Sequence, residues 1–218
     1  MKKQDSTGSE TRNKRLREAS QQRRTQEKQE VRQAILAAAT ELFLEHGYHN
    51  FSLRQVAEKI GYSPGTIYLY FKDKDAILFT IMEEGVARFG QMLAEAASVS
   101  DARERLTRIG EAYIRFGVQN PAHYQLMFMQ RPDYLAREPQ NTAQPIAEIF
   151  DLWRKVVEDA MQAGVLSFGD PTSTGDVLWA LLHGVVSIAI LMPNFDQSRI
   201  HDMTGKALEM LTTGLHKA

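Results

Sequence analysis

The chain has 218 residues, of which 43% are hydrophobic and 24% charged, with no cysteine and a formal net charge of −1. This is the balance of a soluble globular protein with one or two cores. The missing cysteines exclude disulfide and thiolate chemistry and suit a reducing compartment, so we expect a cytoplasmic protein. We also expect no signal peptide. The longest apolar stretch, 177–192, is short for a bilayer span and indicates a buried helix.

The charge is unevenly divided along the chain. Residues 1–74 carry 14 basic and 9 acidic side chains, whereas residues 75–218 carry 12 basic and 18 acidic ones. A basic front half is suited to face phosphate, and an acidic back half is not.

Residues 1–28 are rich in Gln, Arg, Lys, Ser and Thr, and Leu16 is their only large aliphatic residue after Met1. Because such a segment buries little apolar area, we expect a disordered basic arm, with helix toward its end. The arm is either a tail that follows DNA phosphates or a minor groove, or a solubilising leader.

Helical periodicity begins at about residue 29. Val31, Ile35, Ala38 and Leu42 follow a 4-3-4 spacing, and Gly47 is placed to end this helix. A second helix then has a complete start signal. Ser52 and Gln55 form a capping box pattern, and Phe51 and Val56 are spaced as a hydrophobic staple.

Gly61 ends the second helix, and Ser63 with Pro64 begins a short third one that we predict to reach Phe71. Ala57, Gly61 and Ile67 supply the small residue, the turn and the aliphatic packing residue of a helix-turn-helix. The sequence therefore predicts a DNA-binding domain over 29–74, with its motif at 52–71.

The short third helix would enter a DNA groove. Gly65 and Thr66 suit contact with base edges, the latter through a hydroxyl and a methyl group. The phosphate contacts and neighbouring polar positions complete the expected DNA-binding set of Ser52, Arg54, Ser63, Gly65, Thr66, Tyr68, Tyr70, Lys72 and Lys74. Alternatively, Tyr68 packs against the first helix, and the lysines and Arg54 are solvated surface.

The stretch from Phe51 to Leu78, FSLRQVAEKIGYSPGTIYLYFKDKDAIL, resembles the N-terminal domain of the TetR family of regulators. The resemblance implies an all-helical protein of about nine helices that acts as a homodimer on a palindromic operator. It also implies that most such proteins are repressors released by a small ligand. The 28-residue arm is longer than the family's usual leader.

Residues 75–218 are predicted to be entirely helical. The expected segments are 74–97, 101–117, 120–129, a loop at 131–142, a helix to Ala163 ended by Gly164, 171–192, and a last helix with its stripe at Ile200, Met203, Ala207, Met210, Leu211 and Leu215. The 177–192 helix is apolar nearly all round, so we expect a twofold interface made with the last helix. The run at Trp179, His183 and Gly184 resembles the C-terminal domain of one TetR subgroup.

An aromatic and methionine-rich set on neighbouring helices is the candidate effector site, since ligand pockets are lined in this way. Its members are Tyr113, Phe116, Tyr124, Met127, Phe128, Phe150, Trp153 and His183. Each of them can equally be plain core, and His183 can be a core or interface histidine.

The sequence thus predicts an all-α protein with an N-terminal three-helix helix-turn-helix domain and a C-terminal helical domain for effector binding and dimerisation. Its expected partners are double-stranded operator DNA, a second copy and a small apolar or amphipathic effector, without a membrane. It would be a sequence-specific repressor. The alternative is a DNA-binding structural or nucleoid-type protein without effector, which a filled core lacking a pocket of roughly 300 Å3 would favour.

An enzyme is not expected. The chain has no HExxH motif and no cysteine, and its six histidines are scattered apart from His46 and His49, which flank a turn. We therefore expect no catalytic residue, no metal site and no cofactor.

Overall fold

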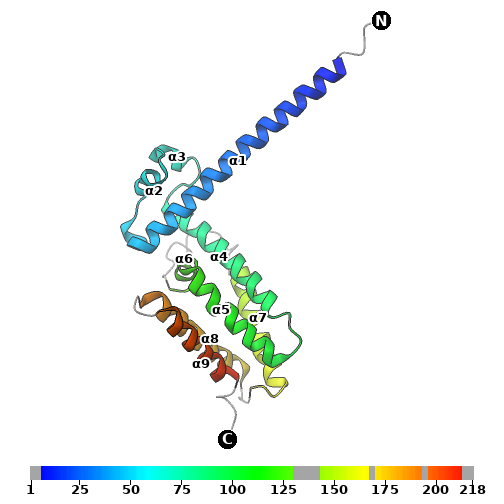
Figure 1. Cartoon of the computed structure of the whole chain (residues 1–218), viewed down its shortest axis with the longest axis vertical. Coiled ribbons are helices and arrows are strands. Elements are labelled where there is room, and N and C mark those ends of the chain that lie inside the picture. The colour runs from blue at the N-terminus through cyan, green and yellow to red at the C-terminus, as the bar shows by residue number, and fades with distance from the viewer. Residues whose placement is uncertain (1–5, 130–142, 167–169, 193–195, 213–218) are drawn as a thin grey trace. The chain divides into compact units, whose positions relative to one another are not determined.

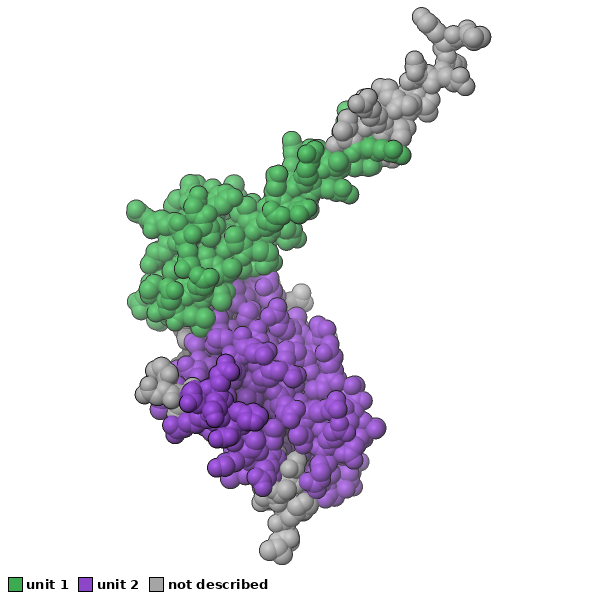
Figure 2. Space-filling model, in the orientation of Figure 1, with its two compact units in different colours: residues 1–78 green, residues 79–218 purple. Residues whose placement is uncertain are grey.

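The computed structural model describes residues 6–129, 143–166, 170–192 and 196–212. Within these ranges the chain forms nine α-helices, one 3-10 turn and one π-helical turn, with no strand (Figure 1). It divides into two compact units, residues 1–78 and 79–218 (Figure 2). The fold class is therefore all-α, as the sequence predicts.

The first unit ends at Leu78, beyond the expected boundary at residue 74. The first turn of α4 (Lys74–Ala96) explains the difference, because it is bonded to the residue that follows the first helix. The Tyr48 hydroxyl donates to Asp75 Oδ1 at 2.8 Å, and Lys74 Nζ donates to the Tyr48 carbonyl at 2.8 Å. These two bonds tie the start of α4 to the helix-turn-helix unit.

The N-terminal arm differs from the expected disorder. Helix α1 runs without a break over Ser6–His46, so the described part of the arm is helical. Arg, Gln, Glu, Lys and Ala have high helix propensity, and a helix already nucleated over the buried residues 35–43 adds further turns at low cost. The absence of a buried face, which argued for disorder, does not prevent such growth.

The helix-turn-helix starts and ends as its caps predict. After Gly47 (φ 72°) and the 3-10 turn η1 (Tyr48–Asn50), α2 spans Leu53–Ile60 with the Ser52 hydroxyl accepting from the Gln55 amide. Gln55 completes the cap differently from a full capping box, since its Oε1 accepts from the Ser52 hydroxyl at 2.9 Å. Gly61 then reverses the chain at φ 74°.

Helix α3 (Pro64–Tyr68) is shorter than the predicted Pro64–Phe71. Its last turn is tightened by the bonds from the Leu69 amide to the Thr66 carbonyl and from the Tyr70 amide to the Ile67 carbonyl. Such three-residue bonds commonly close a short helix. Ile67 and Phe71 are nevertheless both buried, as predicted.

The second unit contains the rest of α4 and five further α-helices with the predicted boundaries to within a few residues. They are α5 (Ala102–Gln119), α6 (Pro121–Tyr124), the π turn η2 (Gln125–Met129), α7 (Ala143–Gln162), α8 (Pro171–Leu191) and α9 (Gln197–Thr212). Asp101 and Asp170 cap α5 and α8 through their carboxylates. The expected loop at 131–142 and Leu215 lie outside the described residues, as does the side chain of Leu211.

Helix α5 is the centre of this unit and contacts α7, α8 and α9. Arg105 on α5 donates to Asp159 on α7 at 2.7 Å, and both side chains are largely buried. The Trp153 indole on α7 donates to the Gly175 carbonyl on α8 at 3.0 Å. These bonds fix α7 to its two neighbours.

Helix α8 is apolar but not fully covered within one chain. By length and composition it is the one described helix able to cross a membrane, a test that core helices of soluble proteins also pass. Its large exposed side chains are Val177, Ile188, Leu191 and, at the C-cap, Met192, and Met210 on α9 is also exposed. The predicted α9 stripe is therefore partly buried, at Ala207, and partly exposed.

A close crossing of α5 and α8 gives a stability prediction. A Cβ added at Gly117 would lie 2.2 Å from Val186 Cγ1, whereas one at Gly90 would lie 3.5 Å from Ile149, an ordinary contact. We expect Gly117→Ala to lower the free energy of unfolding by about 1–3 kcal/mol through overpacking. Gly90→Ala, the matched helical control, should leave it unchanged or raise it by up to about 1 kcal/mol. Equal values in urea unfolding would contradict the close approach.

Candidate DNA interface and effector cavity

The surface expected to meet DNA is built on a buried frame. Leu53, Val56 and Ala57 of α2 and Ile67 of α3 are all buried in the first unit. The Tyr62 amide donates to the Ala57 carbonyl at 2.9 Å across Gly61, which closes the turn between the helices. The opposite side of α3 is consequently held rigidly toward solvent.

The small residues at the start of α3 lie on this open side. The Ser63 hydroxyl accepts from the Thr66 amide at 3.2 Å and bonds the Thr66 hydroxyl at 3.0 Å. A Cβ on Gly65 would meet nothing closer than Ser63 Oγ at 3.7 Å, so the backbone here is open to approach. The Thr66 hydroxyl is thus engaged by Ser63, and Thr66 itself is half-buried.

Tyr68 is 59% exposed, so most of its side chain is open to solvent and not packed against the first helix. Its neighbour Leu69 is 83% exposed, the most open large apolar side chain described. Leu69 is absent from the expected DNA-binding set. Its available signal was its position, because it directly follows residues expected to contact DNA.

The predicted cations have different surroundings. Lys74 Nζ lies 4.4 Å from the centre of the Tyr48 ring and 5.5 Å from that of Phe51, besides donating to the Tyr48 carbonyl. Its charge therefore has partners within the unit. Lys72 is exposed, and Arg54 forms an exposed ion pair with Glu58 at 3.0 Å. Ser52 is exposed beside Arg54, and Tyr70 is half-buried.

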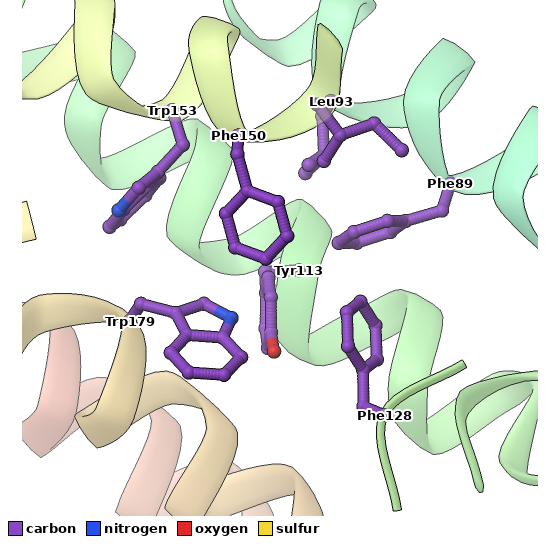
Figure 3. Close-up of a pocket in the computed structure, with 8 residues that line it drawn as sticks. Phe89, Leu93, Tyr113, Phe128, Phe150, Trp153 and Trp179 are labelled. Carbon is purple, nitrogen blue, oxygen red and sulfur yellow. The ribbon is translucent and has the colours of Figure 1, made fainter. Parts of the chain in front are cut away.

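The second unit holds a small cavity among aromatic side chains. Figure 3 shows the Phe150 ring pointing inward between Trp153 and Phe89, with Trp179, Tyr113 and Phe128 facing it. The cavity volume is about 20 Å3, close to the space of a single water molecule. Its lining residues are Phe89, Leu93, Tyr113, Phe128, Ile149, Phe150, Trp153 and Trp179.

Half of the predicted effector residues line this cavity, namely Tyr113, Phe128, Phe150 and Trp153. The other half, Phe116, Tyr124, Met127 and His183, do not. Phe116 is fully buried against Phe89, with ring centres 4.8 Å apart. The lining residues that were missed are Phe89, Leu93, Ile149 and Trp179. The four-residue spacing of Phe89 and Leu93 was an available signal.

A buried polar group adjoins the cavity. The Tyr124 hydroxyl lies 2.6 Å from His183 Nδ1, and the Tyr113 hydroxyl lies 2.8 Å from that of Tyr124. Burial lowers the pKa of His183, which favours a neutral ring whose Nδ1 accepts the Tyr124 proton. Burial also raises the pKa of both tyrosines, so they remain neutral donors.

Among the described residues, no group of three or more His, Cys, Asp or Glu side chains is arranged to hold a metal ion. The hydroxyls of Tyr113 and Tyr124 and the His183 ring form one continuous polar chain. Its chemistry is that of a fixed hydrogen-bonding element within an apolar core.

A helix-turn-helix unit with an open second helix, joined to a helical unit with an aromatic cavity, defines a DNA-binding regulator with a separate sensing domain. Two family models agree with this. Residues 35–81 match "Bacterial regulatory proteins, tetR family", and residues 106–211 match "Tetracyclin repressor-like, C-terminal domain". The chain belongs to the TetR family of transcription regulators.

The chain is 25% identical to the Fatty acid metabolism regulator protein of Bacillus subtilis, over 84% of this chain and 94% of the relative. Among solved structures, FadR from Bacillus subtilis in complex with stearoyl-CoA has a TM-score of 0.64 at 23% identity, covering 84% of this chain and 99% of that one. AibR in complex with isovaleryl coenzyme A and operator DNA has a TM-score of 0.69 at 18% identity, with 83% and 97% covered. The structures establish the shared fold.

The buried histidines generate a prediction about pH. Burial lowers the pKa of His183, and burial followed by the charge of Arg88 lowers that of His123. Below the unfolded-state value of about 6.5, the unfolded chain takes up protons that the folded chain takes up only at lower pH. The free energy of unfolding should therefore fall as pH is lowered from 7 to 5.

The matched variants His183→Gln and His123→Gln should each flatten this dependence, since glutamine does not titrate. Urea unfolding of the three proteins at pH 7, 6 and 5 measures the effect. A slope in His183→Gln as steep as in the parent chain would show that His183 keeps an ordinary pKa in the fold.

Proposed function

We propose that the chain is a sequence-specific DNA-binding repressor, acting in the cytoplasm, that an amphipathic acyl compound releases from its operator. The observation that supports this most directly is the pairing of two features. A short helix exposes Gly65 and Tyr68 with the half-buried Thr66 between them, and a separate unit encloses an almost purely apolar aromatic cavity. The first suits a DNA groove and the second suits a hydrocarbon chain.

On this proposal, base and phosphate contacts are divided between two groups of residues. Gly65 and the Thr66 methyl approach base edges, while Tyr68, Tyr70, Lys72, Lys74, Arg54, Ser52 and Ser63 meet phosphates. The Tyr48 carbonyl and ring hold the Lys74 ammonium group in place, and from this position Lys74 contacts phosphate. It therefore contributes a positioned cation whose side chain is ordered before DNA arrives.

The acyl class of effector is argued from the cavity and from relatives. Phe89, Phe128, Trp153 and Trp179 offer no charge for a strongly polar ligand. The two similar structures described above carry stearoyl-CoA and isovaleryl coenzyme A. A fatty acyl thioester has the apolar chain that such a cavity accepts, with a polar end that stays in water.

The small volume of the cavity is relevant to the alternative hypothesis, an architectural DNA-binding protein without an effector. A volume of about 20 Å3 is far below the roughly 300 Å3 expected of an occupied pocket, which taken alone favours an architectural protein without effector. The relatives weigh against that reading. In addition, Phe150 is 42% exposed and Phe128 lies on the π turn, so rim side chains are placed to rotate and widen the cavity.

A second copy of the chain completes the proposal. Val177, Ile188 and Leu191 share one exposed side of α8, and Gly184 lies on the same side with no atom within 4 Å of an added Cβ. An apolar stripe with a small residue at its centre favours close helix packing across a twofold axis. As with other members of the family, no catalytic role is proposed.

Selection of bound sequences from a random duplex library at fixed salt tests the function. We expect a palindromic consensus. On that duplex, Tyr68→Phe should weaken binding about fivefold, the cost of about one hydrogen bond, with the consensus unchanged. Thr66→Ser, which keeps the hydroxyl and removes the methyl, should change the preferred base, whereas Thr66→Val should not. Salt-sensitive binding without a consensus would support the architectural reading instead.

The effector is tested by the chain's own fluorescence, because its two tryptophans, Trp153 and Trp179, both line the cavity. Acyl-CoA thioesters of increasing chain length should shift the emission and release the operator, and free coenzyme A should do neither. Leu93→Phe, which fills the cavity, should weaken acyl binding by about tenfold or more while operator binding persists. Phe150→Ala, at the exposed rim, should instead admit longer chains. No emission change with any thioester would exclude this effector class.

A further inference from the structure

The described part of the N-terminal arm, residues 6–28 of α1, extends beyond the packed part of the helix (Figure 1). At 1.5 Å per residue it measures about 35 Å, close to one turn of duplex DNA. Its described side chains are almost all exposed, and the first fully buried residue of α1 is Ile35. The arm therefore adds little to the core of the first unit.

Three of the seven basic side chains in residues 6–28 are arranged in phase with the core. At about 100° per residue, Arg17, Arg24 and Lys28 fall within an arc of about 40°, and we call them the basic stripe. About five full turns separate Arg17 from Ile35 and Arg24 from Leu42, so each pair shares one side of the helix. Ile35 and Leu42 are buried in the first unit. The basic stripe thus continues the side of α1 on which the helix-turn-helix lies.

The stripe has no partner in the described part of the chain. None of its three side chains forms an ion pair there, although the arm also carries acidic residues, among them Glu10 at the same helical angle as Lys28. The next basic residue along this side is Arg32, whose Cζ atom lies 5.2 Å from the centre of the Phe71 ring. Phe71 lies just after α3. A row of positive charge therefore runs along α1 to the base of the DNA-facing helix.

We propose that the basic stripe binds the phosphate backbone of duplex DNA flanking the operator half-site, as a second contact surface besides the helix-turn-helix. The occupant follows from charge and composition. The arm has a strong excess of basic residues and almost no apolar ones, which suits a polyanion and not a helical protein partner. The inference rests on the proposed DNA-binding function and extends it.

Two matched double variants test the stripe with the selected operator. Arg24→Gln/Lys28→Gln removes two stripe charges, and Arg15→Gln/Arg23→Gln removes two charges from the far side of the same helix, about 160° and 120° from the centre of the stripe. Glutamine keeps the helix propensity. Each protein is titrated with the operator alone and with the operator extended by about ten base pairs on each side.

The parent chain should bind the extended duplex more tightly, and the stripe variant should lose that gain, about tenfold or more at low salt. The slope of log affinity against log salt should fall by about 1.8 for two lost phosphate contacts, and the far-side control should keep the parent behaviour. Equal binding of both duplexes by the parent, or equal losses in the two variants, would overturn the proposal while leaving the repressor function intact. A parent chain that binds no operator would overturn both.

A different occupant would also be visible. Sedimentation of the stripe variant without DNA should match that of the parent chain. A change in the oligomeric state would assign the stripe to contacts between protein chains and overturn the DNA proposal.

Discussion

The close approach of α5 and α8 at Gly117 sets the geometry of the second unit. Val186 occupies the place that any larger residue at position 117 would need. One turn before each of these residues lie Tyr113 and His183, so the same crossing determines how far apart the polar groups of the two helices are. The Tyr113–Tyr124–His183 hydrogen bonds are possible because the helix backbones meet at this glycine. Trp179 lies a further turn toward the start of α8, and the same crossing brings it to the cavity wall.

This arrangement joins a rigid element to an adaptable one. The hydrogen-bonded tyrosines and histidine have defined directions and resist repacking, because an unpaired buried hydroxyl is costly. Across the cavity, Phe128 and Phe150 lie on a π turn and on a partly exposed helix face. An entering chain would therefore move the rim and leave the polar side in place. A cavity with a fixed polar side and a movable rim can be small when empty and still accept a ligand.

Interactions between residues close in sequence predicted much of the fold, whereas contacts between residues distant in sequence were less predictable. Ser52, Ser63, Asp101 and Asp170 each cap a helix through atoms within three residues, so the sequence pattern contains the whole interaction. The cavity wall combines Phe89, Tyr113 and Trp179 from three helices, and no periodicity within one helix shows that they meet. Lys74 is an intermediate case. The sequence placed it in the expected DNA-binding set, but its Tyr48 partner lies 26 residues away in sequence, beyond local reasoning.

The unbroken continuity of α1 restricts how the arm can change during evolution. Substitutions that exchange Lys and Arg, or that alter exposed glutamines, leave the helix and its orientation intact. Deletion of one residue between Lys28 and Ile35 would instead rotate the whole arm by about 100° relative to the buried residues. Insertion of seven or eleven residues there would nearly preserve the original angle. Insertions and deletions retained in this linking segment should therefore come in lengths close to whole numbers of helical turns. The helical rotation per residue imposes this constraint.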